Sequence, residues 1–206
     1  MTFIRPTRRE AAADVAVVVG LSGAYVVTAL AGAPHRLVIP AVTGALVAYA
    51  AFVLARRGER PRDFGLTAPR LAPSLPAISF TALAATALIL LGLATGVDLW
   101  RPEMAVLLPL YPLWGIVQQL IFQGVLHRRL LMLLGPGWLP ALLTAVFFAA
   151  VHAGDAKLVA LTLVAGLAWS FLFQRYPNVW VLGLSHGVLA ALAYPLAMGR
   201  NPLLEL

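Results

Sequence analysis

Seven long apolar stretches dominate the 206-residue sequence. A helix needs roughly 20 apolar residues to cross the hydrocarbon core of a bilayer. Because 61% of the residues are hydrophobic and only 11% are charged, a water-soluble domain could not bury this much apolar surface. We therefore predict one all-α domain over residues 1–206, a polytopic transmembrane helix bundle of about seven spans. The predicted spans are Ala11–Leu30, Leu37–Ala55, Leu75–Val97, Met104–Leu126, Gly137–Ala153, Ala156–Phe173 and Val179–Met198.

The basic residues alternate between the two sides of these spans. The chain has 15 Lys and Arg against 8 Asp and Glu, a formal charge of +7. With a cytoplasmic N-terminus, eleven basic residues lie inside and four outside, as the positive-inside rule requires. The inner group is Arg5, Arg8, Arg9, Arg56, Arg57, Arg60, Arg62, Arg70, Arg128, Arg129 and Arg175, and the outer group is Arg36, Arg101, Lys157 and Arg200. This distribution indicates a membrane partner and no nucleic acid.

The preference for Arg over Lys also suggests the kind of organism from which the protein comes. Fourteen of the fifteen are Arg, and Ala, Leu and Gly are abundant, as in proteins of GC-rich genomes. We therefore expect an integral, multi-pass protein of a prokaryotic cytoplasmic membrane, with its N-terminus inside.

The first stretch has two interpretations. Arg5, Arg8 and Arg9 precede it, and Ala29-Leu30-Ala31 is similar to a cleavage site, as in a secretory signal peptide. Its apolar length exceeds the roughly 7–15 residues of a signal-peptide core, which favours an uncleaved signal-anchor.

Two segments differ from the spans. The prolines and charges of Arg56–Pro73 indicate a cytoplasmic loop. The segment His127–Leu134 follows the fourth span and is stopped by Gly135-Pro136-Gly137, which predicts a short interfacial helix.

Polar side chains interrupt three of the spans. The fourth contains Gln118, Gln119 and Gln123, the fifth ends in FFAAVHAGD with Phe148 and His152, and the seventh contains Ser185 and His186. Polar groups at membrane depth usually face a cavity or the bundle interior. A simpler interpretation is structural, because a buried Gln often only bonds to a neighbouring helix and a His near a span end is often interfacial.

A metal or thiol site is not indicated. The chain has no Cys, and two histidines with one Gln lack a third strong ligand, so we expect no metal and no cofactor. Asp155, three residues after His152, is expected to be a solvated loop residue. All eight acids fall in expected loops, tails or the first turn of a span.

These three segments resemble the motifs of the CAAX prenyl protease and bacteriocin-processing family, the CPBP or Abi intramembrane proteases. The family's Glu-Glu-x-x-x-Arg motif, usually within EExxFRG, aligns with Gln118–Gly124. Its Phe-x-x-x-His motif is met by Phe148 and His152, and its His-x-x-x-Asn motif by His186 with Ala190 at the last position. The resemblance covers residues 104–190 and implies a CPBP-like core there.

The resemblance also implies roles for the site residues. Gln118 stands at the position of the glutamate that activates water, Gln119 at the second glutamate and Gln123 at the arginine. His152 and His186 stand at the two histidines. A Gln amide cannot accept a proton at neutral pH, and general-base catalysis typically contributes about 10²–10⁴-fold. Replacement of the acids alone would leave an unpaired arginine in the membrane, whereas here that position is also an amide.

Two functions follow from this reasoning. The first is a pseudoprotease that binds a membrane peptide, a lipid-linked molecule or a partner protein in a polar intramembrane cavity without hydrolysing it. The alternative is an active CAAX-protease-like intramembrane endopeptidase with altered chemistry, using His152 or His186 as the base.

Overall fold

The computed structural model describes residues 6–204, so Arg5 and Glu205 lie outside the described residues. Within this range all regular structure is helical, which confirms the predicted all-α bundle. The α-helices are α1 (Arg8–Leu30), α2 (His35–Arg56), α3 (Leu71–Ala94), α4 (Met104–Gln119), α5 (Arg128–Leu134), α6 (Trp138–Ala150), α7 (Ala156–Arg175) and α8 (Val179–Ala197). A π-helix, η2 (Leu120–His127), joins α4 to α5, and short 3-10 turns, η1 (Pro61–Phe64) and η3 (Pro202–Leu204), follow α2 and α8.

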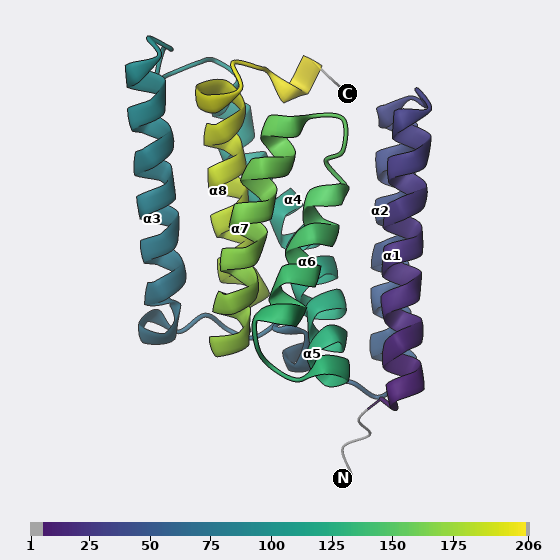
Figure 1. The fold of residues 1–206 in the computed structure, drawn as a ribbon. Coiled ribbons are helices and arrows are strands. Elements are labelled where there is room, and N and C mark those ends of the chain that lie inside the picture. Colours follow the sequence, from purple (N-terminus) through teal and green to yellow (C-terminus); the bar gives the residue numbers. More distant parts are fainter. Residues whose placement is uncertain (1–5, 205–206) are drawn as a thin grey trace.

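Helices α1 and α2 form an antiparallel hairpin at one side of the bundle (Figure 1). The start of α1 is fixed by a capping box, because the Thr7 side chain accepts from the Glu10 N–H and the Glu10 carboxylate accepts from the Thr7 N–H. The helix therefore begins at Arg8, three residues before the predicted span. Asp14 lies in the second turn and not in the first.

The segment from Met104 to Leu134 is one continuous helical rod of 31 residues. The predicted helix before Gly135 is present as α5, but it continues from η2 without a break. The π-helix was not predicted. Such segments occur often at functional sites, and this one covers the residues that follow Gln119.

Helix α8 packs against α4 through glycines. A Cβ on Gly183 would lie 2.5 Å from Ile116 Cα, and a Cβ on Gly187 would overlap the Pro112 backbone. Only residues without a side chain allow two helix backbones to approach this closely. This approach places His186, between the two glycines, against the motif-bearing rod.

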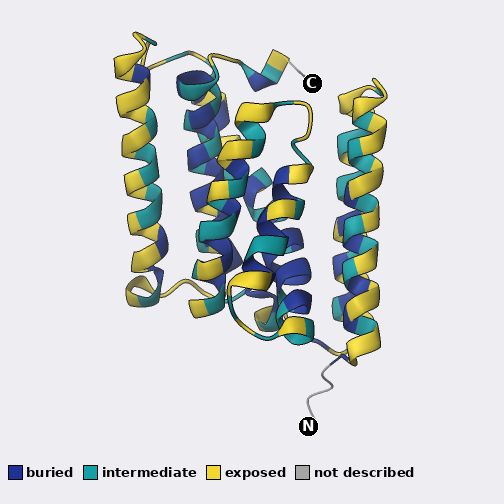
Figure 2. Ribbon diagram, in the orientation of Figure 1, coloured by how far each residue is buried: buried dark blue, intermediate teal, exposed yellow. Residues whose placement is uncertain are grey.

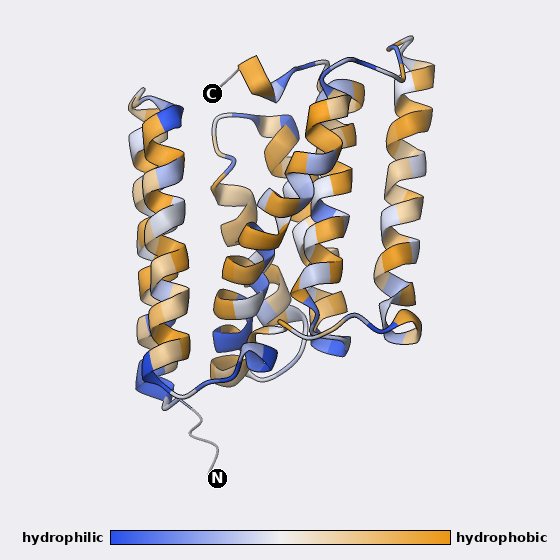
Figure 3. Ribbon diagram, turned by 180° about the vertical axis from the view of Figure 1, so that it is seen from behind, coloured by the Kyte–Doolittle hydropathy of each residue, from blue (hydrophilic) through white to orange (hydrophobic). Residues whose placement is uncertain are grey.

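Six helices are long and apolar enough to cross a membrane. The predicted fifth span is shorter than expected, since α6 has 13 residues. Its Ala141, Ala145 and Phe148 are buried against the bundle, while Trp138 and Val146 on its other face are 66% and 44% exposed. Apolar residues of the outer helices face outward, including Leu83 of α3, which is 73% exposed (Figures 2 and 3). These exposed apolar surfaces, on helices long enough to span a bilayer, imply a lipid environment.

The helices alternate in direction, so each loop belongs to one of two ends of the bundle. We call the end where α1 begins the N-terminal end and the other the opposite end (Figure 1). Of the described basic residues, only Arg36, Arg101, Lys157 and Arg200 belong to the opposite end. The charge asymmetry is therefore present in the fold, while the cytoplasmic position of the N-terminal end stays a prediction.

Candidate functional site

A cavity of about 810 Å³ lies between the α1–α2 hairpin and the core helices. The C-terminal half of α1 and the N-terminal half of α2 line one side, with Tyr25 and Thr43 among the lining residues. Trp114 and Gln118 of α4 line the other, and His152 follows from the turn after α6. Because these segments belong to the half of the bundle near the opposite end, the cavity lies in that half.

Gln118 and His152, which sequence reasoning assigned to one site, both line this cavity. The His152 Nδ1 lies 2.9 Å from the Phe148 carbonyl oxygen. A carbonyl oxygen only accepts hydrogen bonds, so Nδ1 carries the proton and the lone pair is on Nε2. The ring is therefore held in one tautomer by the helix that carries it.

Gln119 and His186 lie behind the cavity wall, in the protein interior. Gln119 is 1% exposed and His186 is 6% exposed. Gln119 Nε2 lies 3.5 Å from His186 Nδ1, a long contact. The His186 ring packs between aromatic rings, with centroid distances of 5.4 Å to Phe148 and 4.9 Å to Trp169. Phe148 also contacts His152, at 5.3 Å, so one ring links the two histidines.

Gln123 is buried against α7. It is 1% exposed, and its Nε2 donates to Ser170 Oγ of α7 at 3.0 Å. The amide oxygens of Gln119 and Gln123 accept no hydrogen bond from the described residues. The three motif glutamines thus face the cavity, α8 and α7 in turn, and Ser170 is a partner that the sequence did not reveal.

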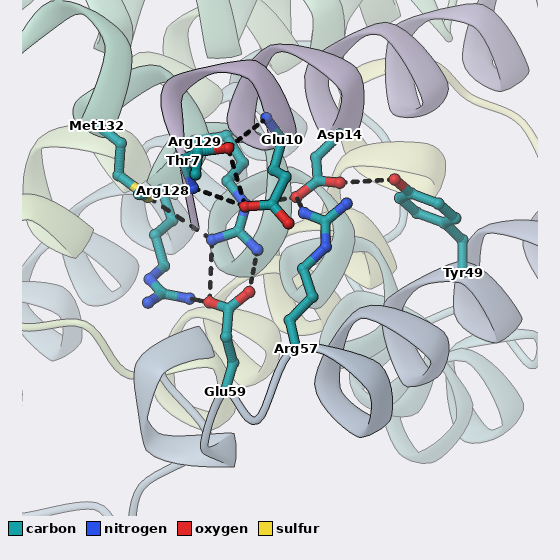
Figure 4. A network of polar contacts seen from close by, with 9 residues as sticks. All are labelled: Thr7, Glu10, Asp14, Tyr49, Arg57, Glu59, Arg128, Arg129 and Met132. Carbon is teal, nitrogen blue, oxygen red and sulfur yellow. Dashed lines mark hydrogen bonds and ion pairs between the residues drawn. The ribbon is translucent and has the colours of Figure 1, made fainter. Parts of the chain in front are cut away.

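A buried ion-pair network ties the α1–α2 hairpin to the end of the motif-bearing rod (Figure 4). Asp14 accepts from Tyr49 Oη and Arg57 Nη1, each at 2.6 Å, and from Arg129 Nε at 2.7 Å. Glu59 accepts from both Arg128 and Arg129. The side chains of Arg129 and Asp14 have no exposed surface.

This network corrects the expectation that every acid lies in a loop, a tail or a first turn. Asp14 is a fully buried residue of the second turn of α1, and Glu59 is buried although it follows α2 in a loop. The signal in the sequence was a lone acid among apolar residues, which requires a partner. The partners of Asp14 come from residues 35 to 115 positions away, which local sequence patterns do not reveal.

Asp155 is the one carboxylate among the described residues that line the cavity. It is not simply solvated as expected. Its Oδ1 accepts from the N–H groups of Lys157 and Leu158, each at 3.0 Å, and its Oδ2 pairs with Arg200. The bond from the Leu158 N–H, with Arg200 adding to it, holds the pKa of Asp155 below its ordinary value. An ionised, paired carboxylate of this kind is a poor general base.

The fold and the cavity define a multi-pass helical membrane protein with a polar site inside its bundle. Residues 99–192, which include α4, η2 and α5 to α7, match the family of type II CAAX prenyl endopeptidase Rce1-like proteins. This match agrees with the resemblance to the CPBP proteases, and residues 99–192 are similar to the Rce1-like proteins. No curated protein and no solved structure gives a significant match to the chain.

Within the described residues, no group of three or more His, Asp or Glu side chains could hold a metal ion. Besides the Asp155–Arg200 ion pair, the polar groups that line the cavity include the Gln118 amide, the imidazoles of His35 and His152, and hydroxyls. These groups bind and orient carbonyl and amide groups well. The proton acceptors among them are the imidazoles.

Proposed function

We propose that this protein is a pseudoprotease with an Rce1-like core, which binds a membrane-embedded peptide in the cavity without hydrolysing it. One observation carries the proposal. Gln118 lines the cavity, and the motif resemblance aligns it with the family's water-activating glutamate, while Asp155, the one carboxylate among the described lining residues, is engaged by Arg200 and the N-terminus of α7.

The buried part of the site supports the same proposal. Gln119 and Gln123 are neutral, and each has a neutral partner, His186 and Ser170. An acid or an arginine alone at either position would be an unpaired buried charge, which is strongly destabilising. The buried part of the site is therefore coherently neutral, which supports a binding role and not a catalytic centre with one missing group. The same proposal covers a lipid-linked molecule or a partner protein as the occupant of the cavity.

Active hydrolysis is the second candidate, and His152 favours it. Its Nδ1–H bond to Phe148 leaves Nε2 as a proton acceptor at the cavity wall. An imidazole in this state can act as a general base near neutral pH. His186 is a weaker candidate because it is buried between Phe148 and Trp169, behind the wall.

A cross-linking assay combined with a cleavage assay separates the two. A photoreactive amino acid replaces Trp114, which lines the cavity, and in the control replaces Leu83 on the exposed face of α3. Prenylated CAAX peptides and membrane-anchored C-terminal tails are offered to the purified protein. We expect cross-links from position 114 only, and intact peptides. Cleavage that disappears in His152→Ala would instead establish the enzyme.

A further inference from the structure

After α8 the chain folds back over the cavity at the opposite end of the bundle (Figure 1). It turns at Gly199, where φ is +64°, and the Arg200 N–H donates to the Tyr194 carbonyl at 3.0 Å. Arg200, Pro202 and Leu203 then line the cavity. We call residues 199–204 the C-terminal strap. Figure 1 shows it crossing from the end of α8 toward the space beyond α7.

An ion pair between Arg200 and Asp155 joins the strap to the cavity rim. Arg200 Nη1 binds Asp155 Oδ2, and Asp155 lies three residues after His152. Among the described residues that line the cavity, Asp155 is the one acid and Arg200 the one guanidinium. The charges of the cavity therefore consist of a single pair, one member of which belongs to the strap.

The two members of the pair are held very differently. Asp155 is the N-cap of a 20-residue helix and is fixed there by two backbone N–H groups. Arg200 belongs to a non-helical segment, and its side chain is 42% exposed against 22% for Asp155. Exposed ion pairs add little stability and exchange readily with other partners. The carboxylate is the preorganised half of the site, and the guanidinium is the half that another cation can replace.

We propose that Asp155 is the recognition group for a basic side chain of the peptide that occupies the cavity, and that Arg200 holds this position until the peptide arrives. The inference rests on the proposed peptide-binding function and adds a ligand class to it. Pro202 and Leu203 also line the cavity. The strap therefore illustrates the peptide sequence that we expect to bind there, a basic residue followed two and three positions later by apolar ones.

The test uses the strap sequence as a free probe. A fluorescent peptide Gly-Arg-Asn-Pro-Leu-Leu, with the sequence of residues 199–204, is titrated into the full-length protein in nanodiscs and followed by fluorescence anisotropy. The control peptide has Gln in place of its Arg. The proteins are the natural chain, Arg200→Gln, and Arg200→Gln with Asp155→Asn. Asn caps a helix as well as Asp does, so the second change removes the charge and keeps the cap.

We expect the Arg peptide to bind Arg200→Gln about fivefold or more tightly than it binds the natural chain, because the tethered strap no longer competes. Asp155→Asn should reverse this gain, and the Gln peptide should show no preference. Equal affinity of the Arg and Gln peptides for Arg200→Gln would overturn the proposal. So would a loss of binding in Arg200→Gln with no effect of Asp155→Asn, which would make Arg200 the receptor for an anionic ligand.

The result also separates this inference from the proposed function. If neither peptide binds any variant while membrane peptides still cross-link at position 114, Asp155 recognition is wrong and the cavity still binds peptides. A second readout uses the absence of Cys in the chain. Leu203→Cys should react faster with a soluble maleimide when Arg200→Gln is added, because the strap is released. An unchanged rate contradicts a strap held by Asp155.

Discussion

Arg129 and Asp14, 115 residues apart in the sequence, meet inside the protein with Nε 2.7 Å from Oδ2 and no exposed side-chain surface on either. This pair joins α1 to α5, the last turns of the rod that carries the motif glutamines. The N-terminal end of the α1–α2 hairpin is thereby fixed to that rod, while toward the opposite end the cavity separates them. The network thus sets the relative position of the two cavity walls.

Removal of Arg129 should be strongly destabilising. Arg129→Met leaves Asp14 and Glu59 without their shared buried partner, a change that typically costs about 3–5 kcal/mol. The matched control is Arg128→Met, because Arg128 also pairs with Glu59 but is 21% exposed. We expect its effect to be within about 1 kcal/mol. The free energy of unfolding in mixed micelles measures both, and equal effects of the two substitutions would contradict a clamp centred on Arg129.

The close approach of α4 and α8 should be intolerant of a single methyl group. Gly183→Ala places a Cβ 2.5 Å from Ile116 Cα, and backbone atoms cannot move aside as a flexible side chain can. Overpacking of this kind typically costs about 1–3 kcal/mol. Gly20→Ala in α1 is the control, since its Cβ has no neighbour within 4 Å. Thermal unfolding should show a clear loss for Gly183→Ala alone, and similar curves for both variants would refute the tight contact.

The neutral state of the buried site makes a specific prediction about restoring the family residues. Gln123→Arg puts a guanidinium where the present side chain is 1% exposed and bonds only to Ser170. Without an acid nearby, we expect a loss of several kcal/mol. Adding Gln119→Glu supplies an opposite charge four residues away and should recover part of the loss. A stable, fully folded Gln123→Arg single variant would show that the buried site tolerates a charge, and would contradict this prediction.

The Asp155 carboxylate predicts a pH dependence at the opposite end of the bundle. Its pKa is lowered in the folded protein from an ordinary value of 3.8, first by the bond from the Leu158 N–H. A lowered pKa means that the ionised form stabilises the fold above the unfolded value, and that this stabilisation is lost as the pH falls through the folded value. We expect the natural chain to exceed Asp155→Asn in melting temperature at pH 6, and this difference to shrink as the pH falls below 3.8. A difference independent of pH would exclude the charge as its cause.

The apolar stretches predicted the helices well because the bilayer imposes one length and one composition on every span. The largest difference concerns α6, where Gly137–Ala153 shortens to Trp138–Ala150. A short helix with one buried and one exposed apolar face is as apolar as a spanning one, so composition cannot separate them. The start of α1 was readable, since Thr7 and Glu10 form a capping pattern that the hydropathy of the span overshadowed.

The site was predictable only in part. Motif spacing assigned Gln118 and His152 to one site, and both line the same cavity. Spacing could not show that Gln119 faces His186 in the interior or that Gln123 faces Ser170, because a π-helix turns the chain between them and has no hydrophobic signature of its own. The strap and the ion-pair network depend on contacts between distant segments, which a single sequence does not encode in any local pattern.

The most direct test of the central proposal is a single experiment on the natural chain in nanodiscs. A membrane-anchored peptide is incubated with protein carrying the photoreactive group at position 114, and mass spectrometry records both cross-linked and cleaved peptide. The proposal predicts a cross-linked, intact peptide and no cleavage above that of protein-free nanodiscs. Cleavage by the natural chain that His152→Ala abolishes would contradict it.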